Sequence, residues 1–575
     1  MKILKLSDIF SFANTKRAIA LILALAMLVL AGCNKNKNNT SSKDNTSSGS
    51  SQTTSADDQN ASDEAEDETD DTYTPGTSTS AYIDPLKGEI SVDPVVSKET
   101  LRKDASETYV VDPSNLCYKY KGYAQKERDK LLDEILNTPN TLKYYTPKKG
   151  AKIYYVSPSG SNTADGLSPE TALMTVDGVY SLDLQAGDFV LFERDSVYRL
   201  AGRFYLTEGV TYGSYGTGKK PMFLGSPRNF AKDVWKPSTK KNVWYISYMN
   251  TFPCGMFLND GEEFGYLKLT LRALEKNTDF YYDEEGARLY LYCDKGNPGN
   301  VYKSIEVSQS EMTFYLGTGI DNVTIDNIAM RYMGDGGVYS NYNNNGWSVT
   351  NCEIGFCGGT QMGAVRGGNG VGTWCGGQYL YWDHNWVYHT FDNGMSPQGN
   401  AGRKLFGDYH DISHSNNLFE FNNADIEIWE TGKAGEECKF YNYYMNNNIC
   451  RFTSLGWGTR ADDGGIRGID GVHYGHLRAN QITGPFQFNN NIIDCPGRML
   501  YKFENENKAV YDAFERKGNT YYIKQSMRTD NSLCRNFHWP NEDGHSGTLS
   551  ATNEEKTKEI IKMIEPDVKA IYWYK

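Results

Sequence analysis

The sequence predicts an all-β solenoid, in which short strands joined by turns wind into successive coils. The first observation is a repeat: Asn-rich triplets stand before an aliphatic or aromatic residue, and a Gly- or Asp-containing turn follows. The repeat is marked by Asn327, Asn351, His384, Asn416, Asn446, Asn489 and Gly518, with steps of 24, 33, 32, 30, 43 and 29 residues. The second observation is that the runs between these marks are β-branched and aromatic, without helical periodicity. A β-sandwich with Asn-rich hairpins is the alternative. Short loops would join its strands in pairs, whereas in this sequence the Asn position recurs only once per coil.

Asparagine at a fixed position of each coil has a physical role in such a solenoid. Its side chain can hydrogen-bond the backbone of the neighbouring coil, so equivalent asparagines are expected to form a ladder inside a turn. Strand side chains also alternate between the interior and the surface. Aligning the coils by their aliphatic residues puts Val338, Met395 and Ile426 inside the solenoid and their neighbours Tyr339, Ser396 and Glu427 outside. Two residues later, Gln398 and Trp429 also point outside. The turn before each strand holds Asp335, Asp392 or Asn423.

The N-terminus predicts export. Lys16 and Arg17 precede the apolar run 18–30, which is short for a membrane-spanning helix and typical of a signal peptide. The run ends in LAGC, which resembles a bacterial lipoprotein signal, and the resemblance implies that Cys33 is lipidated; an uncleaved membrane anchor is the alternative. We therefore expect an extracytoplasmic protein, held at the bacterial cell membrane surface by a lipid anchor only.

Composition limits the partners of the chain. The 575 residues carry a net charge of −13, which argues against nucleic acid as a partner. Aromatic residues make up 13% of the chain, including 41 Tyr and 10 Trp, and those outside a core suit the flat faces of sugar rings. We expect a monomer whose partner is a polysaccharide or an oligosaccharide.

Two other kinds of element interrupt the repeat. Residues 234–302 alternate like antiparallel hairpins around DG and EEG turns, which predicts a small inserted β domain. Residues 123–137 form an amphipathic helix, and we expect it to cap the first coil, as residues 554–564 cap the last one. Such caps protect the terminal strands from edge pairing. The apolar face of the first helix consists of Leu131, Leu132, Ile135 and Leu136.

Three segments carry a resemblance to a known family. Residues 154–179 contain SPSGSN, a DG turn and SPETA, residues 184–200 contain AGDFVLF, and residues 213–221 contain a YG turn. They resemble the first coils of right-handed parallel β-helix (pectate-lyase-like) carbohydrate-active enzymes. The insertion resembles that of β-helix glycoside hydrolases, including exo-acting β-xylosidases. The resemblance covers residues 153–523 and implies an all-β, right-handed parallel β-helix with an inserted small antiparallel β domain and a helical cap.

The predicted organisation follows from these segments. Residues 34–80 contain only four apolar side chains and residues 81–105 lack periodicity, so residues 34–105 are expected to be a disordered linker. In chain order we expect a lipoprotein signal peptide (1–33), this linker (34–105), an N-terminal helical cap (106–152), the first β-helix coils (153–233), the inserted β domain (234–302), the main coils (303–530) and a C-terminal cap (531–575).

Asp392 and Glu427 are the candidate catalytic residues. In the coil alignment they lie about one coil apart and face the same side. Two such carboxylates can hydrolyse a glycosidic bond, because one protonates the leaving oxygen while the other attacks or activates water. The DNG turn at Asp392 and the DIEIW strand around Glu427 resemble an Asp-x-Gly turn and an Ile-Glu strand of β-helix enzymes. Asp392 is equally explained as a turn residue, and Glu427 as a solvated outward charge.

Six residues are candidates for substrate binding: Arg366, Trp374, Trp382, His389, Gln398 and Trp429. Trp can stack on sugars, although a single Trp is more often buried. Arg366, in a Gly-rich loop, can bind a uronate carboxylate or hold the loop. A polysaccharide lyase remains an alternative, with cations and a base taken from Arg366, Arg403, Lys404 and His389 and with Ca²⁺ as cofactor. A non-catalytic carbohydrate-binding or adhesive β-helix is a third reading, and it would need no acid pair.

No cofactor is expected for a hydrolase. The chain has 11 cysteines but no pair of CxxC motifs, so we expect buried thiols, or one or two disulfides, rather than zinc ligands. Residues 458–480 are interpreted as a lid or subsite loop. The acids and histidines of this loop lack the spacing of an EF-hand calcium loop; they are Asp462, Asp463, Asp470, His473 and His476.

Overall fold

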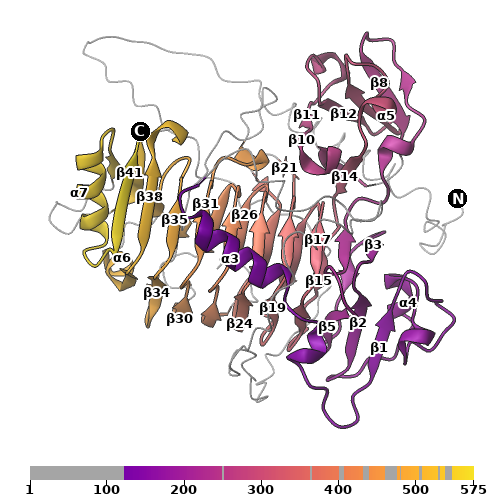
Figure 1. Cartoon of the computed structure of the whole chain (residues 1–575), viewed down its shortest axis with the longest axis horizontal. Helices are drawn as coiled ribbons and strands as arrows, with labels where there is room; N and C mark the ends of the chain where they lie inside the picture. The colour runs from indigo at the N-terminus through magenta and orange to yellow at the C-terminus, as the bar shows by residue number, and fades with distance from the viewer. Residues whose placement is uncertain are drawn as a thin grey trace, which may run out of the picture. The chain divides into compact units, whose positions relative to one another are not determined.

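In the computed structural model the chain forms a right-handed parallel β-helix, as predicted (Figure 1). The structure describes residues 122–248, 251–359, 361–362, 365–399, 407–430, 439–459, 476–478, 481–503, 508–528, 531–537 and 547–575. Each complete coil contributes one strand to each of three long sheets. Neighbouring strands within these sheets are parallel, apart from the pair β39 and β40.

The three sheets are named here by their first strands. The β1 sheet consists of β1 (Ile153–Val156), β2 (Phe189–Glu193), β5 (Thr211–Tyr215), β16 (Thr324–Asp326), β19 (Ser348–Thr350), β24 (Gly377–Asp383), β27 (Tyr409–Ser413), β30 (Lys439–Tyr444), β33 (Gln481–Ile482), β34 (Phe486–Asn489) and β37 (Phe514–Lys517). The β3 sheet consists of β3 (Val197–Arg199), β6 (Met222–Leu224), β17 (Ala329–Arg331), β20 (Glu353–Gly355), β25 (Trp386–Tyr388), β28 (Leu418–Glu420), β31 (Ile449–Arg451), β35 (Ile492–Asp494), β38 (Thr520–Lys524) and β41 (Ala570–Tyr574). The β4 sheet consists of β4 (Phe204–Tyr205), β15 (Phe314–Leu316), β18 (Gly336–Asn341), β23 (Asn369–Trp374), β26 (Asn393–Gly399), β29 (Ala424–Glu430), β32 (His476–Arg478), β36 (Tyr501–Phe503), β39 (Ser532–Phe537) and β40 (Gly547–Ser550).

Inward side chains of successive coils stack into rows that fill the helix. In the β4 sheet, Val338, Val371, Met395 and Ile426 are partners in four adjacent strands and are at most 1% exposed. This confirms the inward row that the sequence predicts. Burying one such side chain contributes about 1.5–3 kcal/mol, so a one-residue slip, which would expose the row, is strongly disfavoured.

An asparagine ladder joins the coils at one turn. The backbone N–H of each ladder residue donates to the side-chain oxygen of the next, over 2.7–2.9 Å from Cys352 to the carboxylate of Glu565. The side chains between these ends are Asn385, Asn417, Asn448, Asn491 and Asn519. The predicted ladder is therefore present, but one or two residues after the predicted marks. Five of those marks instead have positive φ and make the turn; they are Asn327, Asn351, His384, Asn416 and Gly518.

The insertion forms two antiparallel sheets over a core of its own. One contains β7 (Lys236–Pro237), β8 (Val243–Ser247), β11 (Tyr266–Leu267), β12 (Asp279–Asp283) and β13 (Arg288–Tyr292), with β11 parallel to β12, and the other contains β9 (Pro253–Leu258), β10 (Glu263–Phe264) and β14 (Ile305–Gln309). Helix α5 (Pro298–Val301) lies before β14. Phe257 of β9 packs against Tyr332, Phe356 and Trp457 of the coils, at ring distances of 4.9–5.1 Å. The insertion thus covers an aromatic row at one corner of the β-helix.

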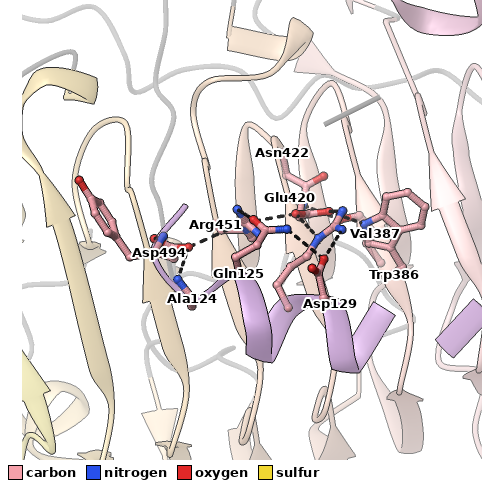
Figure 2. A network of polar contacts seen from close by, with 11 residues as sticks. Ala124, Gln125, Asp129, Trp386, Val387, Glu420, Asn422, Arg451 and Asp494 are labelled. Carbon is pink, nitrogen blue, oxygen red and sulfur yellow. Dashed lines mark hydrogen bonds and ion pairs between the residues drawn. The ribbon is translucent and has the colours of Figure 1, made fainter. Parts of the chain in front are cut away.

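Helix α3 (Gln125–Leu136) does not cap the first coil, which corrects the prediction. It lies across the outer face of the β3 sheet (Figures 1 and 2). Arg128 donates to Glu420 of β28, and the backbone N–H of Ala124 donates to Asp494 of β35. Its apolar face packs there as well, with Leu132 and Ile135 buried. These polar partners lie 292 and 370 residues away in the sequence, so local periodicity predicts the helix but not its position.

Helix α7 (Glu554–Ile564) is the helical cap of the fold. Asn553 caps its N-terminus by accepting from the backbone N–H of Lys556 at 2.9 Å. Ile560, Ile561 and Ile564 are at most 3% exposed and pack into the β-helix core. The chain then adds β41 to the β3 sheet, so strands as well as a helix lie beyond residue 530.

The remaining elements are short. Helices α4 (Val176–Val179) and α6 (Lys508–Ala513) and the hairpin of β21 (Gln361–Met362) and β22 (Val365–Arg366) lie between strands of the coils. No helix in the described ranges is both long and apolar enough to cross a membrane. The eight cysteines that the structure describes are all buried thiols, as expected; they are Cys254, Cys293, Cys352, Cys357, Cys375, Cys450, Cys495 and Cys534.

Candidate functional site

Strands β26 and β29 lie side by side in the β4 sheet and carry the predicted site. Their register pairs Met395 with Ile426, and both side chains are fully buried. Because strand side chains alternate, the next positions, Ser396 and Glu427, point to the outer face of the sheet. The register and the hydrogen bond between Ser396 and Glu427 show that the two residues share one face of the sheet, as predicted. Two residues later the outward positions are Gln398 and Trp429.

Three donors in the described part of the chain hold the carboxylate of Glu427. Its Oε2 accepts from Nδ2 of Asn393 at 2.7 Å, from Oγ of Ser396 at 2.6 Å and from Nε2 of Gln398 at 2.7 Å. All three donors belong to the adjacent strand β26 and are electrically neutral. Glu427 is only 8% exposed. Donors of this kind stabilise the charged form of a carboxylate and fix its orientation, so Glu427 is not a freely solvated surface charge.

A second layer orients one of these donors. Oδ1 of Asn369, in β23, accepts from the backbone N–H of Asn393 at 3.1 Å and from its Nδ2 at 3.2 Å. The sequence did not reveal Asn369 or Asn393 as site residues, because Asn before Gly is a common turn signal. The coil alignment could have found them, since both begin a strand of the β4 sheet.

Two of the predicted tryptophans lie in one outward row beside Glu427. In the strand register Trp374 is the partner of Gln398, and Gln398 is the partner of Trp429. Both tryptophans are partly buried. The structure therefore brings together three of the six predicted binding residues, two positions along the strands from Glu427.

Asp392 lies in the turn before β26, as predicted. Its backbone N–H donates to the carbonyl of Gly368 at 3.4 Å, and its own carbonyl accepts from the N–H of Ala424 at 3.2 Å. The residue is partly buried. It directly precedes Asn393 in the chain, and the side chain of Asn393 donates to Glu427.

Trp382 and His389 do not belong to the site, and both predictions are wrong. Trp382 is fully buried inside the β-helix, where its ring stacks on His414 at 4.4 Å. His389 is 4% exposed and stacks between Phe356 at 5.0 Å and Phe421 at 4.9 Å. The backbone of His389 has positive φ at a corner of the coil, where strand alternation does not hold and the side chain joins the aromatic row.

A tyrosine row continues the Glu427 column toward the first coils. In register, Glu427 and Ser396 are followed by Gly372, Tyr339, Tyr315 and Tyr205. Tyr315 and Tyr339 stack at 6.2 Å, and Tyr205 is 54% exposed. Adjacent strands lie about 4.8 Å apart, so Tyr339 stands about 14 Å from the strand of Glu427.

A second acid, Asp425, lies in the same strand as Glu427 but points inward. It accepts from Nδ2 of Asn422 at 3.1 Å and from the hydroxyl of Thr453, and it is fully buried. Burial raises the pKa of Asp425 to about 8. Asp425 is therefore a neutral residue of the core at neutral pH rather than part of the outer site.

Several predicted residues lie outside the described parts of the chain. They are Cys33, Arg403, Lys404, Asp462, Asp463, Asp470 and His473, together with the side chains of Arg366 and His476. The backbone of Arg366 lies in β22, paired with Gln361. Among the residues that the structure describes, no group of three His, Cys, Asp or Glu side chains could hold a metal ion.

Comparison with known proteins gives distant structural matches only. No protein-family model and no curated protein matches the chain. Solved structures similar to it include the complex of XylC with xylose (13% identity, 73% of this chain, 82% of that chain, TM-score 0.38). Others are the GH136 lacto-N-biosidase from Eubacterium ramulus (14%, 65%, 64%, 0.30) and a rhamnogalacturonan lyase (11%, 69%, 79%, 0.25). Matches this distant carry no information about the activity of this chain, and its fold class rests on its own strand pairings.

Proposed function

We propose that this protein is a glycoside hydrolase that acts on a polysaccharide or oligosaccharide at the outer face of the β4 sheet. The observation that carries the proposal is the Glu427 carboxylate, 8% exposed and held by three donors beside a row with two tryptophans. Asp392 is the proposed second carboxylate, because it adjoins a residue that bonds Glu427. Two carboxylates and aromatic stacking surfaces are the parts that hydrolysis of a sugar polymer requires.

The proposal predicts the products of a substrate screen. The purified chain is incubated with a panel of polysaccharides and oligosaccharides, with and without a chelator. Release of reducing ends without absorbance from unsaturated uronates supports a hydrolase. Unsaturated products overturn the reaction class in favour of a lyase, and binding without cleavage across the panel overturns catalysis in favour of a non-catalytic glycan-binding protein.

Two variants test the site within the same screen. Glu427→Gln keeps the shape of the side chain and leaves an oxygen for the three donors, so activity should be lost in a folded protein. Glu559→Gln, on the exposed side of α7, is the matched control and should keep full activity; its side chain is 58% exposed. Full activity of Glu427→Gln would contradict the site.

The lipid anchor belongs to the same proposal. We propose a monomer tethered through Cys33, where the sequence resembles a lipoprotein signal; a tethered enzyme would act on extracellular glycans. Metabolic labelling with a fatty acid should label the wild-type chain and not Cys33→Ser, and equal labelling of both would contradict the anchor.

A further inference from the structure

One oxygen of Glu427 carries all of the described donors. Oε2 accepts from Asn393, Ser396 and Gln398 within 2.6–2.7 Å. A carboxylate has about four lone-pair positions over its two oxygens, so three donors saturate Oε2. A proton placed on this oxygen would point at the hydrogens of its own donors.

The orientation of one donor follows from the network itself. Oδ1 of Asn369 receives the backbone N–H of Asn393, and a backbone N–H can only donate, so this atom of Asn369 must be an oxygen. The side-chain atom of Asn393 that lies 3.2 Å from the same oxygen must then be the NH₂ group. Its second hydrogen is directed at Glu427, 2.7 Å away. Asn369 therefore fixes Asn393 as a donor rather than an acceptor.

We infer that Asn369, Asn393, Ser396 and Gln398 are positioning residues that keep Glu427 negatively charged. The inference rests on the proposed function and assigns the roles within it: Glu427 is the nucleophile or general base, and Asp392 is left as the acid. Asn393 is 2% exposed and Ser396 fully buried, whereas Gln398 is partly exposed. Gln398 can therefore be replaced with the least risk to folding.

The chemistry of the charged residue balances in either mechanism. As a base, Glu427 takes a proton from water while the water oxygen bonds to the anomeric carbon. As a nucleophile, its oxygen bonds to that carbon, and water later displaces it while giving a proton to the deprotonated Asp392. In both cases the bond from the anomeric carbon to the leaving oxygen breaks with its electron pair on that oxygen, which takes the proton of Asp392.

The first test is the pH dependence of kcat/KM for the whole chain on a glycan that it cleaves. Activity should fall at low pH as Glu427 takes up a proton. Gln398→Leu and Ser396→Ala each remove a donor, so the acidic limb should move upward by about one pH unit. Gln378→Leu, on a strand of the β1 sheet, is the control and should leave the limb in place. A structural role alone would lower kcat at every pH, and an unmoved limb overturns the inference.

The second test needs no substrate and separates this inference from the proposed function. The δ-carbon of Glu427 is followed by ¹³C NMR in the Glu-labelled chain and is assigned by its loss in Glu427→Gln. Its titration midpoint should lie at a higher pH in Gln398→Leu than in the wild type. Equal midpoints overturn the positioning role even if hydrolysis is found. A shifted midpoint in a chain that hydrolyses nothing supports the positioning role and overturns the proposed function alone.

Discussion

Glu420 and Glu427 lie seven residues apart on one coil, and both are nearly buried, but the chain holds them in opposite ways. Glu420, 1% exposed, faces helix α3, where it accepts from Arg128 at 2.9 and 3.0 Å and from the indole N–H of Trp386 at 2.9 Å (Figure 2). Nε of Arg451 lies 3.4 Å from it. Glu427 faces outward on the next sheet, and its described donors are two amides and a hydroxyl.

The difference separates a carboxylate that charged partners hold within the fold from one that we propose as the reacting group. Burial acts to raise the pKa of Glu420, but the guanidinium groups of Arg128 and Arg451 outweigh it and hold that pKa below its usual range. The charge of Glu420 is thus cancelled within the fold. Within the described part of the chain, the donors to Glu427 are neutral groups that fix the orientation of its carboxylate.

The largest predicted effect on stability concerns Glu420, the carboxylate held by charged partners. Glu420→Gln leaves two buried guanidinium groups without their shared counter-charge, so the free energy of unfolding should fall by about 3–5 kcal/mol. Urea denaturation followed by circular dichroism measures this. Because the folded pKa of Glu420 is lowered, its contribution is present above the pKa of an ordinary Glu and disappears as the pH falls through the folded pKa. An unchanged denaturation midpoint would show that this carboxylate does not hold α3.

Asp425 sharpens the comparison, because it is a third acid on the same coil and is kept neutral. With its pKa raised to about 8, its contribution to stability is complete below the unfolded value near pH 4 and is lost as the pH rises toward 8. Asn does not titrate, so Asp425→Asn removes this decrease in stability with rising pH. The stability of the variant relative to wild type should therefore increase by about 1.4 kcal/mol per pH unit across this window. Urea denaturation at pH 5, 6 and 7 tests this, and a pH-independent difference would contradict it.

Replacing Trp429 tests the proposed site around Glu427, with a smaller expected change in free energy. Its partly buried ring adjoins Gln398 in the outward row, and loss of one stacking surface costs about 1 kcal/mol. Trp429→Ala should raise KM about fivefold and leave kcat nearly unchanged, because such binding is uniform in ground and transition states. Tyr379→Ala, a 39% exposed ring on the β1 sheet, serves as the control. Equal effects of the two variants would remove Trp429 from the site.

Tyr339 should show the smallest effect, and only with long substrates. It lies three strands from Glu427 along the same outward column. A chain that follows this column reaches Tyr339 only after several sugar units. Tyr339→Ala should therefore lower kcat/KM about twofold to fivefold for long oligosaccharides, by about 0.5–1 kcal/mol, and leave short ones unaffected. An equal loss on short substrates would point to a general packing defect.

The coils and their outward rows could be predicted from the sequence because they depend on local chemistry. Strand alternation put Glu427 and Gln398 on the outer face, and repeated asparagines indicated a ladder. The alternation of inward and outward side chains fails near the corners of the coil. There Asp425 and Ile426 are both buried, and the ring of His389 stacks between Phe356 and Phe421. Errors of this kind could not be corrected without the backbone angles of the corner residues.

Contacts that do not follow from the stacking of the coils could not be predicted from the sequence. The position of α3 depends on Arg128 meeting Glu420, 292 residues away. The donors of Glu427 come from a strand about thirty residues earlier, and the coil alignment put Ser396 and Gln398 on its outer face, but Asn393 was interpreted as part of a turn. Trp382 shows the same limit, because its burial depends on Trp347 and His414 in neighbouring coils.

The most direct test of the account is to compare Glu427→Gln with Glu420→Gln on a glycan that the wild type cleaves, with kcat expressed per folded molecule. We predict that Glu427→Gln lowers kcat about 10²- to 10⁴-fold while its urea midpoint stays at the wild-type value. Glu420→Gln should keep wild-type kcat and lose stability. Wild-type kcat in Glu427→Gln would contradict the claim that the carboxylate held by neutral donors is the one that reacts.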